Sequence, residues 1–160
     1  MRLTLAAVGK LKAGPERALV ERYQTRAAQL AAGLGFSGPD LRECAEGRER
    51  AVAARKASEA LSLARLVPER AVLICLDEHG ESRSSADFAR KLAHWRDAGT
   101  LGATFVIGGA DGLDPAFLGR ASLRLGFGAM TLPHQLVRVL VLEQIYRAMT
   151  HLAGHPYHRA

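Results

Sequence analysis

The sequence has few cysteines: Cys44 and Cys75 are the only two among its 160 residues, and both stand in apolar segments typical of strands. Two cysteines in a chain of this length exclude the dense disulfide framework of a small secreted domain. We interpret both as buried side chains of a protein that works in a reducing compartment.

Long hydrophobic runs are also absent. A membrane helix needs roughly 18 consecutive apolar residues, and the richest segment, LVRVLVL, is interrupted by Arg138. The opening MRLTLAAVGK holds too short an apolar stretch for a signal peptide. With 48% hydrophobic and 24% charged residues, the composition is that of a globular protein. We therefore expect one domain over residues 1–160, in the cytoplasm and without a membrane.

Three common loop motifs are missing as well. The sequence contains neither the GxxxxGK[ST] of a P-loop nor the GxSxG of a hydrolase elbow, and no GxGxxG follows its first strand-like segment. These absences exclude P-loop NTPases, hydrolases built on that elbow and the usual dinucleotide sites.

The charge balance is basic, with 22 Lys and Arg residues against 16 Asp and Glu residues and a net charge of +6. This balance suits a polyanionic partner such as RNA. Because the sequence has no Lys/Arg block, any surface for a nucleic acid must be assembled by folding.

Apolar strand-like runs alternate with helical patterns along the whole chain. The patterns predict strands at 3–9, 40–46, 71–77, 104–109 and 123–132, and helices at 15–32, 48–66, 84–99, 114–121 and 133–154. Such an alternation indicates an α/β fold, a mainly parallel sheet with helices on both faces. We expect 71–77 to be a central strand and 40–46 to lie nearer the edge.

Ligands of open α/β sheets bind outside the carboxyl ends of the strands. Three loops follow strands in this way and are rich in glycine: LDEHGES after Leu76, GGADGLD after Ile107 and GFGAMTLPH after Leu125. Glycine allows tight turns and a close approach of the backbone to a ligand. We expect a binding site where these loops meet.

The last helix carries an arginine, Arg138, in the middle of its apolar arc. A structural interpretation pairs it with Glu143 or Asp77; a functional one holds a cation near a ligand or a subunit boundary, and we favour the functional one because buried guanidinium is costly. The helix is apolar on most sides, which indicates burial or contact with a partner subunit. We expect a homodimer.

The chain ends in GHPYHRA, an unusual set of side chains for a frayed terminus. His155 and His158 offer proton acceptors, and Tyr157 offers a stacking face. With His151 the two histidines could form a zinc site, but Gly154 and Pro156 break the helix there, and we expect no metal.

The segments LDEHG, FVIGGADGL, MTLPHQLVRVLVLEQIYRA and HPYHR follow one another in the second half of the chain. In this order they resemble the RlmH family of SPOUT methyltransferases, and the opening LTLAAVGKLK is similar to the family's start. The resemblance implies a fold with a deep trefoil knot in its C-terminal part, a homodimer and the cofactor S-adenosylmethionine. It also implies methylation of N3 of a pseudouridine in large-subunit (23S) ribosomal RNA. The choice between free RNA and the assembled ribosome as the substrate stays open, and a small single domain without an RNA-binding appendage favours the assembled ribosome.

Carried over residue by residue, the resemblance also assigns the site. It places the cofactor against Leu76, Gly108, Gly109, Phe127, Gly128, Ala129, Met130, Thr131 and Leu132. The catalytic candidates are His134, His155, Tyr157 and His158, together with Arg138, and the general base among them stays open. A non-catalytic RNA-binding or ribosome-binding module is the alternative function.

Overall fold

The computed structural model describes residues 1–158, and for His158 it describes the backbone alone. The elements along the chain are β1 Arg2–Val8, α1 Pro15–Ala31, η1 Ala32–Leu34, β2 Ser37–Cys44, α2 Val52–Ala64, β3 Ala71–Glu81, α3 Ser85–Asp97, β4 Gly102–Ile107, α4 Pro115–Leu118, β5 Leu123–Leu125, α5 His134–Leu152 and η2 Pro156–His158. The predicted alternation of strands and helices is confirmed.

The strands form one sheet in the order β2-β1-β4-β3-β5, and every pair within the described residues is parallel. β2 lies at the edge, as predicted. The middle strand is β4, whose six residues are all buried, and β3 lies between β4 and β5, so the prediction that 71–77 is a central strand is confirmed. Residues 71–76 of β3 and the whole of β4 are mainly apolar, as expected for parallel strands covered on both faces.

β3 extends beyond its predicted end. The segment LDEHGES was expected to be a loop, but the strand continues to Glu81 with an irregularity between Leu76 and Glu81, and Glu81 pairs with Leu125. Leu76 and Glu81 of β3 thus both pair with Leu125 of β5, with an irregular segment between them.

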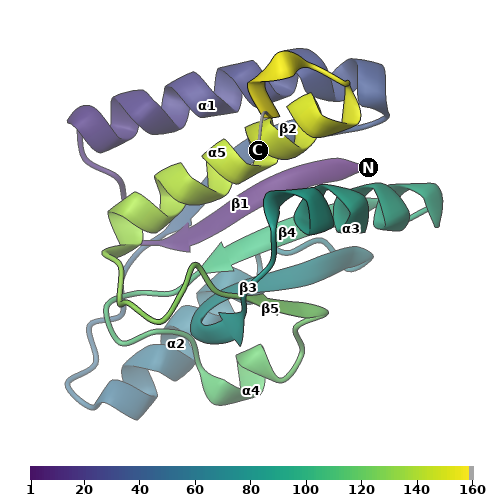
Figure 1. Cartoon of the computed structure of the whole chain (residues 1–160). Coiled ribbons are helices and arrows are strands. Elements are labelled where there is room, and N and C mark those ends of the chain that lie inside the picture. Colours follow the sequence, from purple (N-terminus) through teal and green to yellow (C-terminus); the bar gives the residue numbers. More distant parts are fainter. Residues whose placement is uncertain (159–160) are drawn as a thin grey trace.

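Helices cover both faces of the sheet (Figure 1). Successive side chains of β1 point to opposite faces: Leu3 and Leu5 belong to the larger core with α1, α3 and α5. Ala6 and Val8 belong to a smaller core with Leu63 of α2 and Phe117 of α4.

Local signals begin the helices near their predicted positions. Ser84 caps α3 by accepting a hydrogen bond from the backbone N–H of Asp87. Asp114 caps α4 in the same way, and Pro115 occupies its first position.

α5 lies in the middle of its layer, packed against α1 and α3. Most of its apolar side chains are buried within the chain, and Leu136 is the large exception at 42% exposure. We expected a partner subunit because α5 is apolar on most sides. Packing within one chain already buries most of these apolar side chains, so they do not by themselves require a partner. None of the helices in residues 1–158 is long and apolar enough to cross a membrane.

Candidate functional site

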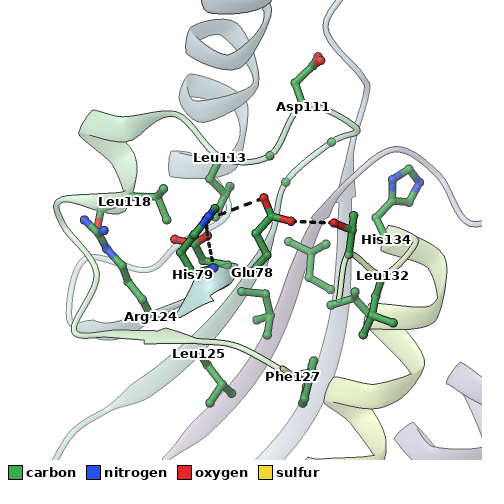
Figure 2. A pocket seen from close by; sticks show the side chains of 18 of the residues that line it. Glu78, His79, Asp111, Leu113, Leu118, Arg124, Leu125, Phe127, Leu132 and His134 are labelled. Atoms are coloured by element: carbon green, nitrogen blue, oxygen red, sulfur yellow. Dashed lines mark hydrogen bonds and ion pairs between the residues drawn. The ribbon is translucent and has the colours of Figure 1, made fainter. Parts of the chain in front are cut away.

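A cavity of about 660 Å³ opens at the carboxyl ends of β3, β4 and β5, beside the start of α5 (Figure 2). The predicted cofactor residues that line it are Leu76, Gly108, Gly109, Phe127, Gly128, Met130, Thr131 and Leu132. Ala129 does not line the cavity and is exposed. The three glycine-rich loops do meet as expected.

The loop after β4 depends on Gly108. The backbone N–H of Gly112 donates to the carbonyl of Gly109 at 3.0 Å, which folds the loop back on itself. A Cβ at Gly108 would lie 2.8 Å from the carbonyl carbon of Gly112, too close for any side chain. Glycine is therefore needed for the turn itself, in addition to any approach of a ligand.

The loops of residues 77–81 and 126–133 are joined across the cavity. The hydroxyl of Thr131 donates a hydrogen bond to Glu78 at 2.9 Å, and the backbone N–H of His79 donates to Asp77 at 3.1 Å. Figure 2 shows Glu78 between His79 and the loop that precedes His134. Sequence reasoning singled out this loop but not its side chains, although the run of polar residues after Leu76 was a usable signal.

A second wall comes from α2, which the sequence did not connect with the site. Lys56 lines the cavity, and its neighbour Arg55 forms an ion pair with Asp111 at 2.6 Å. Glu59, only 5% exposed, accepts a hydrogen bond from the backbone N–H of Gly47 at 2.9 Å. The helix pattern of this segment carries no motif, so nothing in the sequence pointed to these contacts.

Arg138 lies behind the cavity and does not line it. Its guanidinium is 1% exposed and donates to Glu43 at 2.6 Å and to the carbonyls of Val8 and Gly9 at 2.6 and 2.9 Å. The expected partners Glu143 and Asp77 are therefore wrong. Burial lowers the pKa of Arg138, and the Glu43 carboxylate opposes that effect. Buried arginine needs compensating partners, and here they join α5 to the ends of β1 and β2.

His134, at the first position of α5, does line the cavity. Among the catalytic candidates in the described part of the chain, His134 is the one that lies at the cofactor loops of its own subunit. It stands one turn before Arg138, whose ion pair with Glu43 joins the start of α5 to the end of β2.

The C-terminal segment lies at the other end of α5 (Figure 1). A helix of 19 residues is about 28 Å long, so His155 and Tyr157 are remote from His134 of the same chain. His155 is exposed, whereas the ring of Tyr157 packs on Tyr146 with 4.7 Å between centroids. The side chain of His158 and all of Arg159 lie outside the described residues.

Tyr157 is held by several groups of the helix end. Its hydroxyl donates to Glu143 at 3.3 Å, and the guanidinium of Arg147 lies 5.1 Å from its ring centroid. Burial, a hydrogen bond with Tyr23 and the Glu143 charge raise the pKa of Tyr157 to about 12. Tyr157 is therefore held against the end of α5, as expected of a segment that is more than a frayed terminus. Among the described residues, no three His, Cys, Asp or Glu side chains gather as a metal ion would require.

Known proteins resemble the chain over its whole length. The family model described as "Predicted SPOUT methyltransferase" matches residues 1–158. Two relatives named "Ribosomal RNA large subunit methyltransferase H", from Rhodopseudomonas palustris strains BisB18 and HaA2, are 56% and 58% identical over 100% of both chains.

Solved structures are more distant. A probable methylase family protein from Haemophilus influenzae is 14% identical, with a TM-score of 0.50 over 99% of this chain and 70% of its own. The SpoU methyltransferase AviRb from Streptomyces viridochromogenes, solved with AdoMet, is 14% identical with a TM-score of 0.42 over 92% of this chain and 59% of its own.

Proposed function

Because the chain belongs to the SPOUT methyltransferase family, we propose that it transfers the methyl group of S-adenosylmethionine to large-subunit ribosomal RNA. The observation that carries this proposal is the cavity at the carboxyl ends of β3, β4 and β5, ringed by the three glycine-rich loops. The names of the full-length relatives support the RNA substrate.

The residues around the cavity suit the cofactor. Leu76, Phe127 and Leu132 offer an apolar slot for an adenine ring, and the turn at Gly108 and Gly109 offers backbone groups for its edge. When bound, the cofactor supplies an electrophilic methyl group on a sulfonium. The chain's own contribution is then to bind the cofactor, position the acceptor nitrogen and exclude water.

The proposed acceptor is N3 of a pseudouridine in 23S ribosomal RNA, on the assembled ribosome. This nitrogen must lose its proton, and a positioned base assists the loss. His134 stands at the cavity of its own chain, while His155 and Tyr157 stand at the far end of α5.

The distance between these groups supports a homodimer in which the C-terminal segment of one subunit completes the cavity of its partner. Such an arrangement brings His134 and the tail together without moving either. We also propose that the segment after β5 is threaded as the trefoil knot of the family. The support is close packing: a Cβ at Gly80 would lie 2.6 Å from the carbonyl carbon of Leu125. A ribosomal substrate places the protein in the cytoplasm.

Two measurements test the function. Calorimetry should detect binding of S-adenosylhomocysteine, and large ribosomal subunits should gain tritiated methyl groups that mass spectrometry locates on N3 of a pseudouridine. A protein that binds ribosomes but neither cofactor nor methyl groups would support the alternative of a non-catalytic binding module. Light scattering should give twice the chain mass of 17.2 kDa; a monomer would contradict the dimer.

A further inference from the structure

The carboxyl edge of the sheet carries positive charge beside the cavity as well as inside it. β1, β2 and β4 end at the same edge, since Val8 pairs with Cys44 and Ala7 pairs with Ile107. The loops that follow β1 and β2 contain Lys10, Lys12, Arg48 and Arg50, and all four are exposed. With Lys56 of α2, we call these five residues the basic rim.

The cations of the basic rim are free for a partner. None of the five makes an ion pair or a side-chain hydrogen bond with another described residue. Many arginines elsewhere are engaged: Arg2 pairs with Asp40, Arg83 with Glu81 and Arg147 with Glu143. The loop after β2 also carries two carboxylates, the exposed Glu46 and the partly buried Glu49. The five cations of the basic rim outnumber them, so this edge has a surplus of positive charge.

The basic rim is fixed to the cavity by specific contacts. Gly9 donates to the carbonyl of Cys44 at 2.8 Å, which joins the two loops. Arg55 donates to the carbonyl of Glu49 at 2.7 Å and pairs with Asp111 of the loop after β4. Lys56, the next residue, itself lines the cavity. Figure 1 shows the loops after β1 and β2 on the same side of the molecule as the start of α5.

We propose that the basic rim binds the phosphate backbone of the ribosomal RNA that flanks the target nucleotide. This proposal rests on the proposed function, and it adds the surface that holds the substrate outside the cavity. Exposed, unpaired lysine and arginine side chains are the groups that neutralise phosphates, and such contacts position a nucleic acid without reading its bases. The basic rim is joined to the cofactor loops by the contacts described above. Phosphates bound at the rim would therefore hold the acceptor nitrogen of the target nucleotide at a defined position in the cavity.

The test compares two variants that lose the same charge. The rim variant is Lys12→Gln/Arg48→Gln/Arg50→Gln, whose residues do not line the cavity. The control variant is Arg22→Gln/Arg65→Gln/Arg70→Gln, which changes three exposed cations on α1 and beyond the end of α2. Methyl transfer to purified large ribosomal subunits is measured from 50 to 300 mM salt, with the affinity for S-adenosylhomocysteine measured in parallel.

We expect the rim variant to raise KM for the subunit on the order of 10-fold at 150 mM salt and to reduce the salt slope of log KM by about 2. Its kcat and cofactor affinity should stay within about twofold of the original values, and the control should match the original protein. Equal effects of both variants, or no effect of either, would overturn the basic rim. Absence of methyl transfer by the unchanged protein would instead overturn the proposed function.

A crosslink identifies the partner directly. Ala13 is exposed beside Lys12 and can carry a photoreactive p-benzoylphenylalanine. Irradiation of the protein on large subunits should give an adduct with ribosomal RNA. An adduct with a ribosomal protein alone would overturn the assignment to RNA.

Discussion

The two ends of α5 have different surroundings: backbone turns and a cavity at its start, and closely packed side chains at its end. At its start, the surroundings are glycine turns and backbone groups around a cavity, and Arg138 binds two backbone carbonyls and Glu43. At its end, side chains pack closely: Tyr146, Tyr157 and Arg147 stack in sequence. The first end is open and shaped by the main chain, so ligand binding should depend on turns. The second is closed, so its contribution should depend on individual side chains.

The strongest test removes the side chains of the second end. Deleting residues 155–160 should lower methyl transfer to ribosomes on the order of 1000-fold, since it removes His155, Tyr157 and His158 and leaves only His134 of the candidates for proton transfer. Loss of the Tyr146–Tyr157 pair should cost about 1 kcal/mol of stability. Cofactor affinity should stay within about twofold, because every residue that lines the cavity is retained. Tritium incorporation at equal cofactor occupancy measures the effect, and a truncated protein that retains most of its rate would assign the tail a purely structural role.

Arginines at the two ends give a matched pair. Arg138→Ala leaves Glu43 and two carbonyls buried without their partner and should cost about 3–5 kcal/mol of unfolding free energy. Arg147→Ala breaks a more exposed pair with Glu143 and should cost about 1 kcal/mol. Urea unfolding measures both variants. Similar losses at the two positions would contradict the contrast between a buried and a surface arginine.

The open end is tested through its turn. Gly108→Val forces the carbonyl of Gly112 away, and overpacking of this kind costs roughly 1–3 kcal/mol. We expect affinity for S-adenosylhomocysteine to fall about 100-fold, with the melting temperature lowered by only a few degrees. Gly33→Val is the control, since a Cβ there meets nothing within 4 Å. Near-normal calorimetric affinity in the Gly108 variant would remove this loop from the site.

The smallest effect concerns one hydroxyl group. Tyr157→Phe removes the hydrogen bond to Glu143 and should cost about 0.5–1 kcal/mol. Because the pKa of Tyr157 is raised from 10.0 to about 12, its contribution is fully present below pH 10 and is lost as the pH rises toward 12. The original protein should therefore lose more stability across this interval than the variant does. Parallel pH profiles of the two proteins would refute the raised pKa.

Sequence periodicity predicted the elements because apolar spacing determines which face of a helix or strand is buried. It did not predict that Arg138 binds Glu43, since the two stand 95 residues apart and only the sheet order brings them together. The three loops were found because parallel strands end at one edge. The remoteness of Tyr157 from His134 was available from the predicted helix 133–154, whose length separates the two residues, but the sequence analysis grouped both as catalytic candidates without using that length. Lys56 and Glu59 were missed because their segment shows only a helical repeat.

The crossing of residues 77–81 with residues 124–126 has a consequence for sequence tolerance. A Cβ at Gly80 would lie 2.6 Å from the carbonyl carbon of Leu125, and one at Gly126 would lie 2.8 Å from the carbonyl oxygen of Gly80. Each glycine thus faces the other's main chain, and no compensating change at one can make room for a side chain at the other. A library randomised at both positions and selected for a folded protein should return glycine at each of them.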